Sequence, residues 1–128
     1  MYEHKDDFEA EIVILTRAEG GRDTPPVNGI RWDLMYEDDD GGEPSLYVIW
    51  PEFIDANGDA LPRDVPLSGT LRARMHIAND EFAKSIHKIR IRVRTRFFMM
   101  EGSHKMARGT VSWITGLADR RSAGARPA

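Results

Sequence analysis

The sequence predicts an all-β fold in which about six strands close into a small antiparallel barrel or sandwich. Apolar and polar residues alternate over most of the chain, a pattern typical of strands with one buried face. Tandem glycines and prolines separate these runs and mark turns. Only one short stretch has helical spacing. The 128 residues, 41% hydrophobic and 30% charged, fit a single globular domain.

The alternating pattern recurs in six segments of the chain. In the first, Phe8, Ala10, Ile12 and Ile14 fall on one face, which we expect to be buried. Successive side chains of a strand point to opposite sides of a sheet, so the intervening residues should face outward. The predicted strands span residues 8–16, 30–36, 45–53, 69–77, 87–99 and 107–117.

The connections between these strands are rich in turn residues. Residues 79–88 are the only helix candidate, with Asn79 or Asp80 as N-cap, and a structured loop is the alternative. Residues 37–44 form an acidic, glycine-rich loop. We interpret this loop as a solvated hairpin tip rather than a site for a hard cation. Residues 55–59 contain Asn-Gly and predict a turn rather than a calcium loop.

The two ends of the chain lack a regular pattern. Residues 1–7 are expected to be flexible and residues 118–128 disordered, so the predicted domain spans residues 8–117. No apolar run approaches the ~20 residues of a membrane span, and the first residues do not read as a secretory signal. The chain has no cysteine, which removes disulfides and thiolate metal sites. We therefore expect a cytoplasmic protein with no membrane partner.

Charge is distributed unevenly between the two halves of the sequence. Residues 1–60 hold 16 acidic and 4 basic side chains, whereas residues 61–128 hold 5 acidic and 14 basic ones. The split fits two differently charged surfaces that meet different partners. It fits equally well two halves that neutralise each other within one barrel.

A row of cations alternates with apolar residues in the predicted strand 87–99. On one face of a strand such cations project at roughly 6.5–7 Å intervals, twice the rise per residue. Guanidinium groups bind phosphates with salt-dependent affinity, so the row predicts an anion- or RNA-binding surface. The alternatives are that the arginines pair with carboxylates such as Glu9 and Glu11 across a sheet, or that they only solvate an exposed face. The cations of this predicted patch are Lys88, Arg90, Arg92, Arg94 and Arg96, with Arg72 and Arg74 on another strand.

No residue pattern predicts catalysis, a metal site or a cofactor. The serines lie in no nucleophile-elbow pattern, and the chain lacks the phosphate-binding loop of a nucleotide hydrolase. The histidines show no metal-ligand spacing, and each is expected at the surface or in a turn. These histidines are His4, His76, His87 and His104. We predict no catalytic residues and a protein that is not an enzyme.

Two segments near the ends of the predicted domain carry a more specific pattern. The first consists of Glu19, Gly20, Gly21, Arg22, Thr24 and Pro25, followed by Gly29 and Arg31. The second is RFFMMEGSH over residues 96–104, followed by RGTV over residues 108–111. Together they resemble the third, C-terminal β-barrel domain of translation elongation factor Tu. The resemblance covers residues 8–117, strongly at both ends and loosely between, and implies a six-stranded antiparallel β-barrel.

In that family, the barrel packs on a GTPase domain, meets an exchange factor and helps to hold the T stem of aminoacyl-tRNA. The resemblance implies a binding surface at the matched positions Gly20, Gly21, Arg22, Thr24 and Arg31. This sequence departs from the family by adding carboxylates at Asp23 and Asp33. It also has His104 and Trp113 where the family has cations. We expect these changes to weaken tRNA binding, because each lost phosphate contact lowers affinity.

These observations lead to one favoured function and two alternatives. We expect a non-enzymatic binding module that docks a protein partner, with the translation machinery as a candidate source. The first alternative is an RNA-binding protein that uses the strand-borne arginine row. The second is an inhibitor or immunity-type protein whose acidic first half masks a basic toxin. The sequence does not indicate an oligomeric state.

Overall fold

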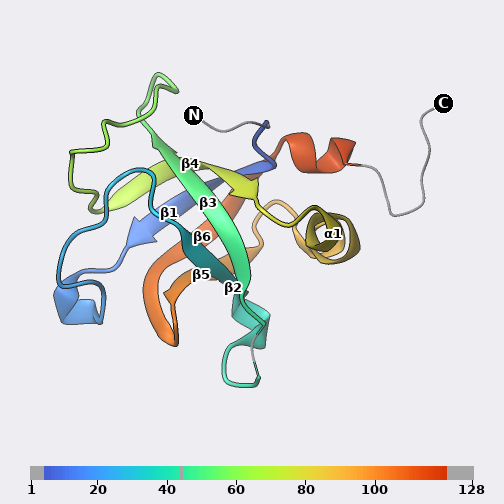
Figure 1. The fold of residues 1–128 in the computed structure, drawn as a ribbon, viewed down its shortest axis with the longest axis horizontal. Helices are drawn as coiled ribbons and strands as arrows, with labels where there is room; N and C mark the ends of the chain where they lie inside the picture. Colours follow the sequence, from blue (N-terminus) through green and yellow to red (C-terminus); the bar gives the residue numbers. More distant parts are fainter. Residues whose placement is uncertain (1–4, 44, 121–128) are drawn as a thin grey trace.

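Six antiparallel strands close into a barrel in the computed structural model of this protein, which describes residues 5–43 and 45–120 (Figure 1). The order of strands around the barrel is β1-β4-β3-β2-β5-β6, and β6 pairs with β1 to close it. The strands are β1 (Phe8–Ile14), β2 (Trp32–Tyr36), β3 (Tyr47–Ile54), β4 (Thr70–Ile77), β5 (Arg96–Glu101) and β6 (His104–Ile114). The predicted all-β, six-stranded antiparallel barrel is confirmed.

Closure of the barrel depends on β1, which pairs with β4 on one side and β6 on the other. Ala10 of β1 lies opposite Ala73 in β4 and opposite Val111 in β6, so it contacts both neighbouring strands. The register shifts between Glu9 and Ala10 and again between Met99 and Met100. Such irregularities increase the local twist that a small barrel requires. Closure gives every strand two neighbours and protects its backbone groups from pairing with other chains.

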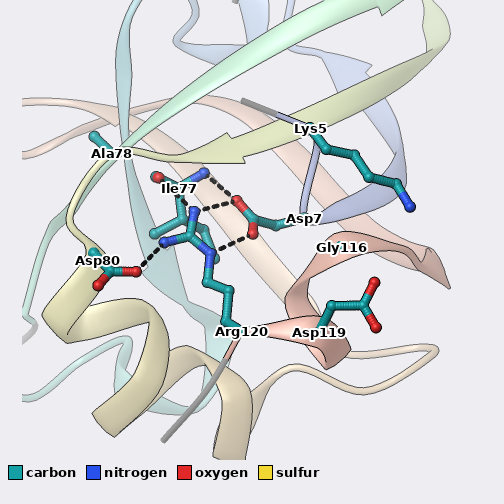
Figure 2. A pocket seen from close by; sticks show the side chains of 8 residues that line it. All are labelled: Lys5, Asp7, Ile77, Ala78, Asp80, Gly116, Asp119 and Arg120. Carbon is teal, nitrogen blue, oxygen red and sulfur yellow. Dashed lines mark hydrogen bonds and ion pairs between the residues drawn. The ribbon is translucent and has the colours of Figure 1, made fainter. Parts of the chain in front are cut away.

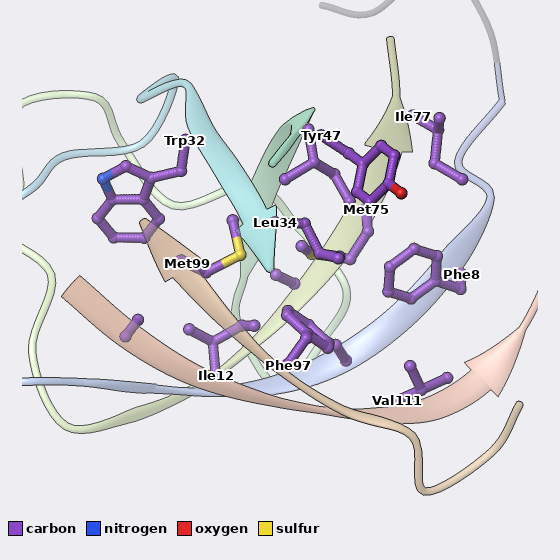
Figure 3. Packing of buried hydrophobic residues seen from close by; sticks show 14 of the residues in the cluster. Phe8, Ile12, Trp32, Leu34, Tyr47, Met75, Ile77, Phe97, Met99 and Val111 are labelled. Atoms are coloured by element: carbon purple, nitrogen blue, oxygen red, sulfur yellow. The ribbon is translucent and has the colours of Figure 1, made fainter. Parts of the chain in front are cut away.

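The barrel interior is filled by the inward faces of the strands (Figure 3). Phe8 of β1 and Phe97 of β5 meet edge to face, with ring centroids 6.1 Å apart. Phe97 also lies against Gly109, where a Cβ would come within 2.2 Å of the ring. Only glycine therefore fits opposite Phe97. The face of β1 predicted to be buried is buried in the structure, at Phe8, Ala10, Ile12 and Ile14.

Residues 80–90 form a helical segment beside the barrel, on the side away from the loop that follows β1 (Figure 1). The segment consists of α1 (Asp80–Phe82), the π-helical turn η3 (Ala83–His87) and α2 (Lys88–Arg90). Asn79 caps it, because its Oδ1 accepts a hydrogen bond from Phe82 N–H at 2.8 Å. The predicted helix and its Asn79 cap are confirmed, and the helix reaches two residues further than predicted.

The predicted strand over residues 87–99 is wrong in its first half. Residues 88–90 are helical, residues 91–95 form a turn, and β5 begins only at Arg96. Thr95 stabilises the turn, since its Oγ1 accepts a hydrogen bond from Arg92 N–H at 2.9 Å. The alternation also fails to separate two faces, because Ile91 is buried whereas Val93 is exposed. The cations of this segment therefore do not form a strand-borne row.

Short 3-10 helices complete the chain: η1 (Arg17–Glu19), η2 (Glu37–Asp39) and η4 (Gly116–Asp119). The predicted turn at residues 55–59 is confirmed. Asp55 Oδ1 accepts hydrogen bonds from the N–H groups of Asn57 and Asp59. The regular structure continues through η4, beyond the predicted domain end at residue 117. The predicted flexible and disordered ends lie largely outside the described residues, at 1–4 and 121–128.

The helices are all short. None in the described part of the chain has the length and apolar character to cross a membrane.

Candidate functional site

The loop after β1 holds its shape by hydrogen bonds within itself. Thr16 and Glu19 form a capping box, in which Glu19 N–H donates to Thr16 Oγ1 at 3.2 Å and Thr16 N–H donates to Glu19 Oε1 at 2.9 Å. The bond from the Thr16 N–H lowers the pKa of Glu19. Gly20 ends η1 in the left-handed conformation, with φ of 96°. A Cβ at Gly21 would lie 2.2 Å from the Leu15 carbonyl oxygen, so this position requires glycine.

The two motif-bearing segments of the sequence meet in space. Arg22 Nε lies 3.1 Å from Oε2 of Glu101, and the Trp32 indole N–H donates to the same oxygen at 2.7 Å. Thr24 is exposed, and the Arg31 guanidinium stacks 5.0 Å from the Trp50 ring centroid. Asp23, one of the added carboxylates, pairs with Arg17 at 3.1 Å. We call residues 16–22 and 101–105 together the loop face.

The loop face borders a shallow groove of about 580 Å³. Its lining includes the apolar side chains of Met35, Leu46 and Met100, together with Glu19 and Gly20. The acidic loop also contributes to the lining, where Asp40 pairs with Lys105 at 2.6 Å. This groove brings together residues of both motifs, among them the predicted site residue Gly20. Its charged side chains already have partners, since Glu19 bonds to Thr16 and Asp40 pairs with Lys105.

Four of the seven predicted anion-binding cations pair with carboxylates of the same barrel. Arg72 lies 3.0 Å from Glu9, and Arg74 lies 3.7 Å from Glu52. Arg90 and Arg96 pair with the acidic segment η2, at 2.9 Å from Asp39 and 3.3 Å from Glu37, respectively. Lys88 Nζ donates to the carbonyl oxygen of Arg120. The basic second half of the sequence thus neutralises much of the acidic first half.

Arg90 covers a buried aromatic cluster rather than an open anion site. Its guanidinium lies 3.9 Å from the Tyr36 ring centroid and makes two hydrogen bonds to Asp39, which raise the pKa of Arg90. Beneath it, the Tyr36 hydroxyl and His87 Nδ1 are 2.5 Å apart. Burial raises the pKa of Tyr36 and lowers the pKa of His87 to about 4, so both groups are neutral at neutral pH.

Arg92 and Arg94 are the exceptions among the predicted cations. Neither has an ion pair among residues 5–43 and 45–120, and both side chains are exposed. Arg94 has φ of 79° and donates its N–H to the Val111 carbonyl oxygen at 2.7 Å. A cleft of about 250 Å³ brings Arg94 beside Arg90 and Arg96, but Glu37 and Asp38 line it too. The predicted row is therefore dispersed into paired and unpaired cations.

A second cleft, of about 380 Å³, opens between the turn after α2 and the end of β6. Among the large apolar lining residues, Val93 is the exposed one, at 52%. Ile89 and Trp113, which are 65% and 64% exposed, adjoin lining residues in sequence but do not line the cleft. Among the described residues, the lining contains two cations and no carboxylate. We call its lining residues the cleft surface: Lys88, Ile91, Arg92, Val93, Ile114, Leu117 and Ala118.

A clasp of charged side chains lies in a neighbouring pocket at the end of η4 (Figure 2). The same η4 carries Leu117 and Ala118 of the cleft surface. Arg120, just after η4, makes hydrogen bonds to both carboxylate oxygens of the buried Asp7, at 2.7 and 3.0 Å. It also donates to Asp80 at the start of α1 at 2.8 Å. Asp7 Oδ2 accepts a further hydrogen bond from Ile77 N–H at 2.8 Å. The clasp thereby connects η4, β1, β4 and the helical segment.

The described residues contain no group of three or more His, Cys, Asp or Glu arranged to hold a metal ion. The predicted surface position is wrong for His76 and His87, which are buried. His87 faces inward because the helical segment turns it toward Tyr36, and His76 Nδ1 lies 3.2 Å from the Trp50 carbonyl oxygen. His104 is exposed, as expected, and His4 lies outside the described residues.

The sequence interpretation missed Val93, Ile114 and the Arg120 clasp. Ala83 and His87, both buried, follow the Asn79 cap at helical spacing, a signal that favours a helix through residue 87 over a strand that begins there. No local signal marks Arg120, whose partners lie 113 and 40 residues away. No protein-family model matches this chain.

Proposed function

We propose that this chain is a non-enzymatic docking module that binds a protein partner, on a barrel like the third domain of elongation factor Tu. The observation that carries the proposal is the cleft surface, where Val93 exposes half of its side chain beside a cleft with apolar walls. Exposed apolar groups gathered at a concave site are typical of interaction surfaces. Scattered single apolar residues would not carry this conclusion.

The loop face supports a docking function less well. Its charged side chains are paired within the barrel, as Arg22 is with Glu101 and Lys105 with Asp40. A partner that used these groups would first have to displace existing ion pairs, which reduces the free energy gained on binding. We therefore assign the primary docking site to the cleft surface.

RNA binding is the second candidate, favoured by one specific observation. Arg92 and Arg94 are exposed and have no ion pair in the described ranges, and Trp113 is exposed as a base-stacking residue would be. The dispersal of the other cations counts against it, because affinity for nucleic acid grows with the number of phosphate contacts. Four of the seven predicted cations already have carboxylate partners.

The test compares Val93→Ser with Val48→Ser as matched control. Val48 is 48% exposed on β3 and does not line the cleft surface, so the control removes an equally exposed apolar side chain elsewhere. Each purified protein is immobilised and incubated with native cell extract, with and without ribonuclease. We expect a protein that both the unchanged chain and Val48→Ser retain, that Val93→Ser loses, and that ribonuclease does not release.

Two results would contradict the proposal. Retention of the same proteins by Val93→Ser would remove the cleft surface as the docking site. Loss of every retained protein after ribonuclease treatment would favour the RNA-binding candidate instead.

A further inference from the structure

The cleft surface has a one-sided charge. Its apolar walls are formed by Ile91, Val93, Ile114, Leu117 and Ala118, and its charged lining residues are Lys88 and Arg92. Because no carboxylate of residues 5–43 and 45–120 lines the cleft, an approaching anionic group meets attraction from these cations without a repulsive charge from the same lining. Arg92 has no ion pair among the described residues and is free to form one with a partner.

The turn that carries Arg92 and Val93 is held in place before any partner binds. Thr95 N–H donates to the Arg92 carbonyl oxygen at 3.0 Å, and Thr95 Oγ1 accepts from Arg92 N–H at 2.9 Å. Arg94 N–H binds the Val111 carbonyl oxygen of β6 at 2.7 Å although its backbone is left-handed. A non-glycine residue in this conformation is strained, and such strain often accompanies functional geometry. A pre-formed turn lowers the entropy cost of binding.

Charge decides between the possible occupants of this cleft. The chain's own last eight residues, RSAGARPA, contain two arginines and no acid, so they do not complement Lys88 and Arg92. A second copy in a symmetric contact would bring the same cationic lining against itself. The lining therefore fits neither the chain's own last residues nor an identical neighbour in a symmetric contact, and it favours an acidic partner segment.

The apolar walls distinguish a protein partner from a nucleic acid. Ile91 and Leu117 are buried at the base of the cleft, while Val93 is half exposed at its margin. Such walls accommodate aliphatic or aromatic side chains, which proteins supply and phosphates do not. A cleft of about 380 Å³ is within the size range of sites that bury small ligand groups.

We propose that the cleft surface binds a short acidic peptide segment of a partner protein, with a large apolar side chain inserted against Ile91, Val93 and Leu117 and a flanking carboxylate paired with Arg92. This inference rests on the proposed docking function and specifies the chemistry of the segment that docks. Electrostatic attraction of the carboxylate adds specificity, and the apolar anchor supplies most of the affinity.

The inference is tested by selecting peptides from a random-peptide display library for binding to the immobilised full chain. We expect the selected peptides to combine Asp or Glu with Leu, Phe or Trp. Synthetic copies of them should bind Arg92→Glu about tenfold more weakly than the unchanged chain. The matched control is Arg63→Glu, which reverses another exposed arginine outside the cleft and should leave binding within about twofold. Circular dichroism verifies that each variant folds.

The remaining outcomes separate the inference from the proposed function. The selected peptides could be neutral or basic, and could bind Arg92→Glu normally but not Val93→Ser. This result would overturn the inference of an acidic segment and leave the docking function intact. Selected peptides that bind Val93→Ser as well as the unchanged chain would overturn the docking function at this surface. A fluorescent oligouridine probe tests RNA binding at the same surface. Tight binding of this probe that is lost in Arg92→Glu, and that the selected peptides do not compete away, would overturn the peptide inference in favour of RNA.

Discussion

The charged side chains of the loop face have partners within the barrel, whereas those of the cleft surface include one, Arg92, with no ion pair in the described part of the chain. Glu101 receives both Arg22 and the Trp32 indole N–H, and Glu19 closes a capping box with Thr16. At the cleft surface, Arg92 extends into solvent beside the half-exposed Val93. A side chain that already has a partner stabilises the fold, and a side chain without one is available for binding. The motif residues and the proposed docking site thus lie in different places in this barrel.

Arg120→Ala gives the largest expected effect, and it acts on the cleft surface by removing the clasp that holds η4. The substitution leaves Asp7, which is 1% exposed, without its cationic partner. Removing one member of a buried ion pair costs more than the pair itself contributes, and we expect the free energy of unfolding to fall by about 3 kcal/mol. Because the clasp holds η4 and with it Leu117, binding at the cleft surface should weaken as well. Urea denaturation measures the change in stability.

The matched control is Arg108→Ala, which removes an exposed arginine without an ion pair in the described part of the chain. Its stability should remain within about 0.5 kcal/mol of the unchanged protein. Equal losses in the two variants would show that the Asp7–Arg120 clasp contributes nothing specific.

Acidic pH is expected to destabilise the protein through His87, which lies in the helical segment that precedes the cleft surface. Burial holds the pKa of His87 at about 4, whereas an unfolded histidine has a pKa near 6.5. Between these two values the unfolded chain binds the proton and the folded chain does not, so the free energy of unfolding falls as pH falls through this window. The shift corresponds to about 3 kcal/mol between pH 6.5 and 4. Urea denaturation at a series of pH values measures it.

His87→Gln isolates the histidine from the carboxylates that also titrate at low pH. Glutamine stays neutral and retains a group that hydrogen-bonds to the Tyr36 hydroxyl. We expect the variant to lose much less stability than the unchanged protein between pH 6.5 and 4. Parallel pH profiles for the two proteins would contradict the assignment of this dependence to His87.

The fold was predictable because hydrophobic alternation acts at every position of a strand. Phe8, Ala10, Ile12 and Ile14 are spaced two apart, and a barrel wall buries one such face whatever its partners are. The same rule failed over residues 88–95, where isoleucine and arginine also alternate. There the Asn79 cap begins a helix, and the turn bonds of Thr95 end it, so local hydrogen bonding outweighs periodicity.

The candidate site was less predictable because it depends on distant pairs. Whether an arginine binds a partner or a neighbouring carboxylate is decided by the register of strands, as at Arg72 and Glu9 on β4 and β1. The sequence offered both outcomes for these arginines and could not choose between them. Arg92 has no ion pair among residues 5–43 and 45–120, whereas Arg90 and Arg96 have one, and no local pattern distinguishes the three arginines.

The smallest expected effect concerns the backbone of the loop face. It tests whether this surface contributes only a backbone conformation or also contributes side chains to binding. A Cβ at Gly21 would lie 2.2 Å from the Leu15 carbonyl oxygen and 2.9 Å from that of Thr16, so Gly21→Ala must displace the backbone. We expect a loss of about 2 kcal/mol, the usual scale for overpacking. Gly42→Ala is the matched control, because its nearest contact is at 3.9 Å and its φ is not positive, and it should be nearly neutral. Binding at the cleft surface should survive in both variants, since neither glycine contributes to its lining. The contrary outcome is a Gly21→Ala protein that keeps its stability but no longer binds the selected peptides. That result would show that the loop face, and not the cleft surface, contributes the binding groups.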